Sequence, residues 1–240
     1  MGSEMCIRDR YKICSFDCIY CQLGRTEKLV VDRNRYISIK ELKVELEEAI
    51  KNVQFDVVTL SGTGEPTLAD NLGDSVVAIK EITDKPVAIL TNSSMLTYSE
   101  VRKELCQLDI VVAKLDAPTP ELFRRINRPH DRIKFGDILN GLREFRKIYT
   151  GKFSLQMMFV DDNKEYAKDM AEIARSMEPD EVQINTPLRE SPVKPLSKTE
   201  ISEIAEHFES FNTITVYTSE KPPVKILDKD ELIKRRKTVL

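Results

Sequence analysis

Three cysteines, Cys14, Cys18 and Cys21, fall within eight residues of the chain. Composition does not account for this cluster, because only two further cysteines occur, Cys6 and Cys106. Thiolates are the metal-binding form of cysteine, and three negative charges held so close together require a cation. The spacing therefore predicts that these three side chains bind a metal centre.

The number of thiols bears on which metal they hold. A structural zinc site is closed by four protein ligands, and no fourth ligand follows Cys21 at the usual spacing. A 4Fe-4S cluster is normally held by four thiolates, so a cluster on three would keep one iron without a protein ligand. We expect that iron to bind a substrate. A non-catalytic iron or zinc module that binds nucleic acid is the alternative.

The segment CSFDCIYCQLGRT, which begins at Cys14, resembles the signature of the radical S-adenosylmethionine (SAM) superfamily. It is similar to the branch of iron-sulfur oxidoreductases related to tRNA wyosine-base synthesis. The resemblance implies two cofactors, a 4Fe-4S cluster and SAM, and reductive cleavage of SAM to a 5′-deoxyadenosyl radical that abstracts hydrogen. It also implies an electron donor such as flavodoxin or ferredoxin, and it suggests tRNA as a substrate. A radical SAM enzyme that activates a protein or acts on a small molecule is the alternative.

Composition is that of a folded protein, with 41% hydrophobic and 32% charged residues and a net charge of -3. This charge gives no argument for extensive coating of nucleic acid. No apolar run is long enough to span a bilayer, and none forms the core of a signal peptide near the start. We therefore expect a cytoplasmic protein without a membrane partner, in which thiols stay reduced.

Short apolar runs alternate with amphipathic segments, which predicts an α/β fold with a parallel sheet. The resemblance favours a partial (β/α)6 TIM-type barrel whose first strand is missing or replaced. A doubly wound sheet is the competing topology, but no Gly-x-Gly-x-x-Gly opens a first helix. The strands are expected at 55–60, 86–91, 109–115, 153–160, 181–185 and 213–217, and the helices at 39–52, 71–83, 98–107, 119–126, 135–149, 163–177 and 198–210.

The two ends of the chain differ from the middle. Residues 1–10 read like a translated sequencing adapter, and we expect them to be a non-native lead that replaces the first strand. The radical SAM core domain is expected at 11–217. Residues 218–240 are expected to be a C-terminal extension that is truncated.

The first strand end carries Gly62, Thr63, Gly64 and Glu65. A tight turn would explain the glycines, because they permit unusual backbone angles. The segment also resembles the Gly-Gly-Glu element of the superfamily, which binds the amino group of SAM. Because ligands of such sheets bind at the carboxyl ends of strands, we favour a binding role for this turn.

A lysine inside an apolar strand is the next signal. Lys114 would be costly to bury without an anion, and the carboxylate of SAM would be such a partner. Asp116 is expected to accept hydrogen bonds from ribose hydroxyls. The alternative is that Lys114 pairs with Asp116 or with another carboxylate at a strand end.

Four further residues are expected near the cofactor. Tyr20 holds the aromatic position of the signature and is expected to pack near adenine, and Asn92 is expected to line the pocket. By resemblance, Gln156 and Asn185 are expected near the sugar or the adenine. The basic segment at 124–134 is expected to be a solvated surface loop, with phosphate contact on tRNA as the minority interpretation.

Overall fold

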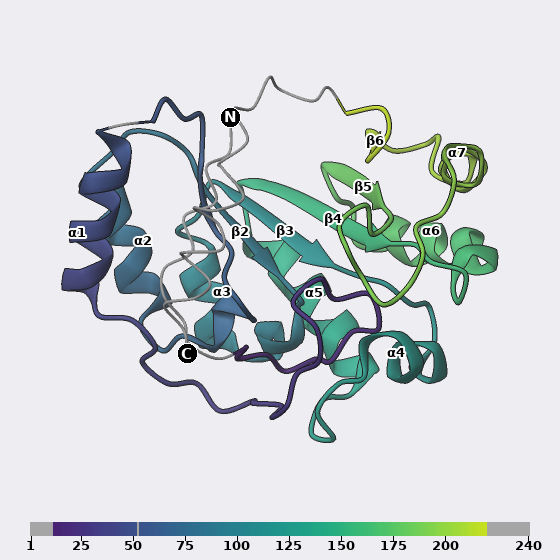
Figure 1. The fold of residues 1–240 in the computed structure, drawn as a ribbon, viewed down its shortest axis with the longest axis horizontal. Coiled ribbons are helices and arrows are strands. Elements are labelled where there is room, and N and C mark those ends of the chain that lie inside the picture. Colours follow the sequence, from purple (N-terminus) through teal and green to yellow (C-terminus); the bar gives the residue numbers. More distant parts are fainter. Residues whose placement is uncertain (1–11, 52, 220–240) are drawn as a thin grey trace.

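The computed structural model describes residues 12–51 and 53–219, and their fold is an α/β sheet of six parallel strands (Figure 1). The strands follow one another across the sheet in chain order, so each connection is a crossover through helical segments. The strands are β1 (Val58–Leu60), β2 (Val87–Thr91), β3 (Ile110–Lys114), β4 (Lys152–Met158), β5 (Glu181–Asn185) and β6 (Thr213–Thr215).

This architecture confirms the predicted partial barrel of parallel strands. Within the described residues β1 and β6 each pair with a single neighbour, so the sheet is curved but not closed. The expected lead at 1–10 and most of the expected extension at 218–240 lie outside the described residues. The prediction that the lead replaces the first strand of the barrel therefore also falls outside them.

Helices flank and back the sheet in Figure 1. They are α1 (Ile39–Ile50), α2 (Leu72–Lys80), α3 (Ser99–Leu105), α4 (Pro120–Asn127), α5 (Phe135–Ile148), α6 (Ala167–Arg175) and α7 (Lys198–Glu206). Short 3-10 turns occupy Pro66–Leu68 (η1), Ser94–Thr97 (η2) and Lys164–Tyr166 (η3). Of the helices that the structure describes, none is both long and apolar enough to cross a membrane.

Local chemistry explains where α1 begins. The side chain of Ser38 accepts a hydrogen bond from the backbone N–H of Glu41, and the Glu41 carboxylate accepts one from the Ser38 N–H. This capping box satisfies two N–H groups that the first turn of a helix leaves without partners. The capping box therefore explains why α1 begins at Ile39, the first residue of the helix expected at 39–52.

The two faces of β4 show how the fold separates core from site. Phe153, Leu155 and Met157 are fully buried in the hydrophobic core. The alternate residues face the other side of the sheet, and there Gln156 and Met158 are only half-buried. Because successive side chains of a strand point to opposite faces, one face packs on the helices and the other carries polar groups.

Candidate functional site at the carboxyl edge of the sheet

The cysteine loop is fastened to the C-terminal end of α4. The backbone N–H groups of Asp17 and Ile19 donate to the carbonyls of Asn127 and Ile126 at 3.0 and 2.9 Å. The last carbonyls of a helix have no partner inside the helix, so the loop supplies the missing donors. In Figure 1 the loop lies close to α4 and α5.

The loop also meets the turn after β1, where the predicted Gly62–Glu65 element lies. The backbone N–H of Glu65 donates to the carbonyl of Ile13 at 2.8 Å. A Cβ on Gly64 would stand 1.6 Å from that carbonyl oxygen, whereas a Cβ on Gly62 would meet nothing within 4 Å. The closeness of the two backbones therefore requires glycine at 64.

The side chain of Glu65 is buried and binds its own chain. One carboxylate oxygen accepts from the backbone and hydroxyl of Thr67 and from the hydroxyl of Thr91, and the other accepts from the backbone N–H of Asn92 at 2.6 Å. Burial raises the pKa of this carboxyl, while the hydrogen bonds oppose the shift. The structure shows Glu65 organising the strand ends, and its role toward a SAM amine stays a prediction.

Asn92 joins Glu65 to the cysteine loop. Its side-chain nitrogen donates to the hydroxyl of Ser15 at 2.8 Å and lies 3.7 Å from the sulfur of Cys14. Burial raises the pKa of the Cys14 thiol to about 12, and the negative charge of Glu65 adds to the effect. Burial therefore disfavours the Cys14 thiolate, and a positive charge beside it would favour that form.

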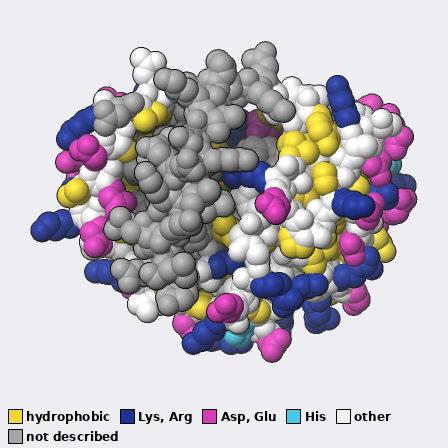
Figure 2. Space-filling view, in the orientation of Figure 1, with side chains coloured by type: hydrophobic (Ala, Val, Ile, Leu, Met, Phe, Trp, Pro, Cys, Tyr) yellow, Lys and Arg dark blue, Asp and Glu magenta, His cyan; other side chains and the backbone are white. Residues whose placement is uncertain are grey.

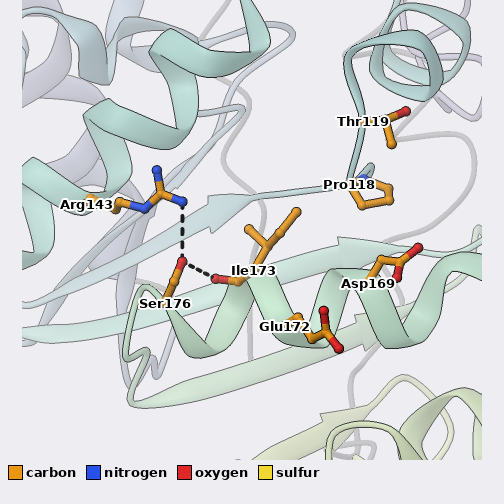
Figure 3. A pocket seen from close by; sticks show the side chains of 7 residues that line it. All are labelled: Pro118, Thr119, Arg143, Asp169, Glu172, Ile173 and Ser176. Atoms are coloured by element: carbon orange, nitrogen blue, oxygen red, sulfur yellow. Dashed lines mark hydrogen bonds between the residues drawn. The ribbon is translucent and has the colours of Figure 1, made fainter.

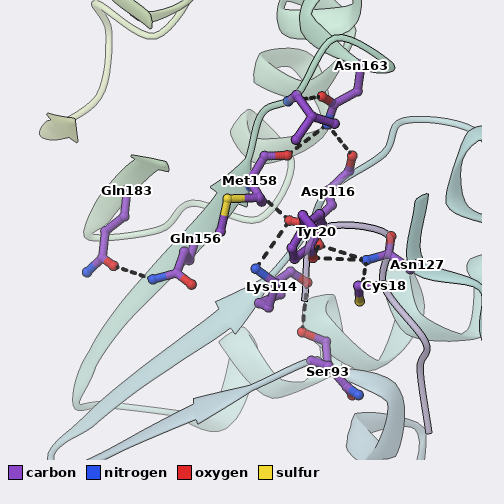
Figure 4. Close-up of polar contacts among 12 residues, drawn as sticks. Cys18, Tyr20, Ser93, Lys114, Asp116, Asn127, Gln156, Met158, Asn163 and Gln183 are labelled. Atoms are coloured by element: carbon purple, nitrogen blue, oxygen red, sulfur yellow. Dashed lines mark hydrogen bonds and ion pairs between the residues drawn. The ribbon is translucent and has the colours of Figure 1, made fainter. Parts of the chain in front are cut away.

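Asp116 is the centre of a second group of polar contacts (Figure 4). Its carboxylate accepts hydrogen bonds from the Tyr20 hydroxyl, from the Asn127 amide at 2.8 Å and from the backbone of Met158 at 2.9 Å. Lys114 places its ammonium 3.5 Å from the same carboxylate and 5.1 Å from the centre of the Tyr20 ring. The ion pair between Lys114 and Asp116 that was left open as an alternative is thus present.

Cys18 belongs to this second group. The side-chain nitrogen of Asn127 lies 3.4 Å from the Cys18 sulfur. Burial raises the pKa of the Cys18 thiol to about 11, with a further contribution from the charge of Asp116. Burial likewise raises the pKa of Tyr20, so its hydroxyl stays a donor to Asp116.

The remaining predicted residues lie on neighbouring strands. Gln156 is the register partner of Lys114, and it donates to the side-chain oxygen of Gln183 on β5 at 3.1 Å. Asn185 ends β5 opposite Met158, and its backbone carbonyl accepts from Phe159. The fold therefore brings the predicted residues to one edge and one face of the sheet.

Sequence analysis missed several residues of the site. Asn127 and Asn163 both bind Asp116, the first to its side chain and the second to its backbone carbonyl. Ser15 holds the loop to Asn92. No local pattern marks them, because the hydrogen bond from Asn127 to Cys18 joins residues 109 positions apart.

The donor set suits an iron-sulfur cluster. Cys14, Cys18 and Cys21 are free, half-buried thiols on one loop. A cluster binds each thiolate to a different iron, so three thiols leave one iron for another ligand. Among the described residues, no group of three His, Cys, Asp or Glu side chains forms a site for a single metal ion. Within residues 12–51 and 53–219, a Cβ on Gly62 would meet no atom within 4 Å and the buried hydroxyl of Thr63 has no hydrogen-bond partner, so this turn has groups suited to a polar ligand.

A hollow of the described surface lies elsewhere, between the start of α4 and helices α5 and α6 (Figure 3). It measures about 400 Å³, and its lining includes Thr119, Arg143 and Glu172 but no predicted site residue. Beside Asp116 and Asn127 the free space is only about 10 Å³. Buried polar groups, rather than the size of a hollow, mark the candidate site.

Comparison with known proteins shows the family of the chain. A family model described as the radical SAM superfamily matches residues 10–174. A UPF0026 protein of Synechocystis is 40% identical over 182 residues, which are 75% of this chain and 68% of that protein. A UPF0026 protein of Methanocaldococcus jannaschii is 33% identical over 226 residues, 92% of this chain and 69% of that protein. The chain also matches a Brachyspira hyodysenteriae protein named GTPase Obg at 37% identity, over 86% of this chain but only 31% of that protein.

Solved structures show the same fold. Streptococcus suis SuiB bound to S-adenosylmethionine superimposes with a TM-score of 0.66 at 16% identity, over 86% of this chain and 48% of that one. A structure described as native anSMEcpe with bound AdoMet gives 0.64 at 13% identity, over 87% and 62% of the two chains. Because the family model matches more than half of the chain, the chain belongs to the radical SAM superfamily.

Proposed function

We propose that this chain is an enzyme that holds a 4Fe-4S cluster on Cys14, Cys18 and Cys21 and cleaves SAM reductively. When bound, the cluster and SAM together supply a 5′-deoxyadenosyl radical that abstracts hydrogen from a substrate. The observation that carries the proposal is the contact of Asn92 with both Glu65 and Cys14. It joins the thiol loop to the turn that resembles the SAM-binding element. Members of this superfamily are generally enzymes.

The residues of the chain have distinct tasks in this proposal. Glu65 fixes the turn so that the backbone of Gly62 and the hydroxyl of Thr63 face the ligand. Lys114 is the cation nearest Asp116 and is only half-buried, so it is able to turn toward the carboxylate of SAM. Tyr20 closes the space above Asp116 and excludes water from it. Gln156 and Asn185 are assigned to the sugar and the adenine by resemblance.

For the substrate we propose a tRNA base. The support is the resemblance of the cysteine loop to the wyosine-related branch. The basic segment at 124–134 adds little support for a tRNA substrate, because Arg125, Arg128 and Arg132 are each paired with an aspartate. In Figure 2 basic side chains gather around α4 with acidic ones among them. Flavodoxin or ferredoxin is the proposed electron donor, in the cytoplasm.

A small-molecule substrate is the second candidate. A protein of Saccharolobus islandicus named "Probable GTP 3',8-cyclase" is 25% identical over 174 residues, which are 72% of this chain.

The chain spans 31% of the Brachyspira protein and about two thirds of its UPF0026 relatives. The activity of the whole protein is therefore a proposal.

Anaerobic cluster reconstitution tests the proposal. We expect bound iron and sulfide, and 5′-deoxyadenosine after reduction in the presence of SAM. Cys18→Ala should abolish both, whereas Cys106→Ala, which removes an exposed thiol away from the loop, should keep both. Equal cleavage by the Cys18 variant would overturn the ligand assignment. Stoichiometric zinc without sulfide would favour the non-catalytic module.

Substrate class needs a separate experiment. The reduced enzyme with SAM is incubated with unmodified tRNA or with guanine nucleotides, and products are identified by mass spectrometry. A new modified nucleoside in the tRNA supports the first candidate. A product formed only from the free nucleotide would favour the small-molecule substrate over the tRNA base.

A further inference from the structure

Two of the three cluster thiols are touched by buried asparagine side chains. The amide nitrogen of Asn92 lies 3.7 Å from the Cys14 sulfur, and that of Asn127 lies 3.4 Å from the Cys18 sulfur. Asn92 follows β2 and Asn127 ends α4, so the fold brings each amide to the loop from a different element. Their exposed fractions are only 8% and 2%.

The other contacts of each amide decide which end faces the sulfur. The nitrogen of Asn127 also donates to the Asp116 carboxylate, which is able only to accept, and lies 3.3 Å from the Tyr20 hydroxyl, so its two N–H groups are shared among these oxygens and the Cys18 sulfur. The side-chain oxygen of Asn92 accepts from the backbone N–H of Ser94 at 3.0 Å. Its nitrogen is left for Ser15 and Cys14. In both cases an N–H group, rather than a carbonyl oxygen, points toward the thiol.

We propose that Asn92 and Asn127 are positioning residues that raise the reduction potential of the cluster by donating hydrogen bonds to the thiolates of Cys14 and Cys18. The inference rests on the proposed function. An electron added to a cluster increases the negative charge on its thiolates, and a donor to sulfur stabilises that reduced form. Cys14 receives a second donor, the backbone N–H of Phe16 at 3.5 Å. Over residues 12–51 and 53–219, no side-chain donor reaches the sulfur of Cys21.

A purely structural role for the two amides makes a different prediction. If they only fasten the loop, their removal lowers cluster loading or stability but leaves the potential of the loaded fraction unchanged. The reduction potential therefore separates the two roles, because it is measured only on protein that carries a cluster.

The experiment compares Asn127→Leu, Asn92→Leu and wild type after anaerobic reconstitution, in a redox titration followed by electron paramagnetic resonance. At a fixed solution potential we expect each substitution to lower the ratio of reduced to oxidised cluster about tenfold. For a one-electron couple this corresponds to a midpoint about 59 mV more negative. The matched control is Asn71→Leu, because Asn71 is a buried asparagine that donates to the carbonyl of Ile37 and lies outside the candidate site.

A second measurement uses wild-type protein, so it does not depend on whether the variants fold. Protein labelled with heavy nitrogen in the asparagine side chains is reconstituted, reduced and examined by pulsed electron paramagnetic resonance. We expect a hyperfine coupling from amide nitrogen to the cluster. Potentials in both asparagine variants equal to wild type, or absence of the coupling, would overturn this inference while leaving the proposed function intact. A wild-type chain that holds no cluster would overturn both.

Discussion

The two edges of the parallel sheet use aspartate in opposite ways. At the amino edge, Asp109 accepts from the backbone of Val87 at 2.8 Å and pairs with Lys80 at the end of α2. Asp180 repeats the pattern two strands on, where it accepts from Phe153 at 2.8 Å and pairs with Arg146 near the end of α5. Both carboxylates are more than two fifths exposed. In each case an aspartate just before one strand binds the backbone of the preceding strand, so the contact joins two adjacent strands.

At the carboxyl edge, Asp116 has a side chain only 1% exposed, and its partners come from separate parts of the chain. Burying a carboxylate is costly unless donors surround it, so this arrangement is not needed merely to join two strands. The difference fits the proposed function, in which the amino edge serves stability and the carboxyl edge holds polar groups in place for a ligand. Each prediction below tests that division.

The largest expected effect is that of Asp116→Ala. Removal of the carboxylate leaves the amide of Asn127, the hydroxyl of Tyr20 and the ammonium of Lys114 without their common partner. We expect a loss of about 3–5 kcal/mol in the free energy of unfolding, together with loss of bound iron. The same substitution at Asp109 should cost far less and spare the iron. Chemical denaturation and iron analysis of both variants would refute the division if the two losses were equal.

Gly64→Ala should have the next largest effect. Its Cβ would enter the carbonyl of Ile13, so the loop or the turn must shift and the hydrogen bond to Glu65 must lengthen. Overpacking of this kind costs about 1–3 kcal/mol. Gly62→Ala is the matched control, because it lies in the same turn and meets no atom within 4 Å. Thermal unfolding should separate the two variants, and equal midpoints would contradict the close approach.

The edges also differ in what the sequence could predict. Short apolar runs predict the strands, and the observed bounds of β5 match the expected 181–185, because the pattern of apolar residues within a short window indicates a strand. The cysteine motif is likewise contained in one short segment of the sequence. In contrast, the hydrogen bond from Tyr20 to Asp116, which is 96 positions away, was not predicted, and the place of Tyr20 beside adenine stays a prediction. Such a contact exists only after folding, so no sequence window contains it.

A smaller effect is expected from Asp109→Asn and Asp180→Asn. Each substitution weakens one hydrogen bond to a strand backbone and one exposed ion pair, so we expect a loss of about 1 kcal/mol. The two side chains share no partner, so the losses should add in the double variant. Urea unfolding measures the sum. A double variant that also lost its cluster would show that the amino edge contributes to the site.

The smallest effect is the pH dependence of the Asp109 contribution. Burial alone would raise its pKa, but the hydrogen bond from Val87 and the bond and charge of Lys80 outweigh burial and hold the pKa below its ordinary 3.8. Because the pKa of Asp109 is lower in the folded protein than in the unfolded chain, its stabilisation is complete above the unfolded pKa. This stabilisation is lost as the pH falls through the folded pKa. The difference in unfolding free energy between wild type and Asp109→Asn should therefore be constant near neutral pH and shrink below about pH 4. Added salt should weaken the exposed contact with Lys80 but not the backbone hydrogen bond, so part of the difference should survive at neutral pH in high salt. A difference that widens in acid would mean that Asp109 is bound more tightly as the neutral acid, and that the amino edge resembles the buried carboxyl edge after all.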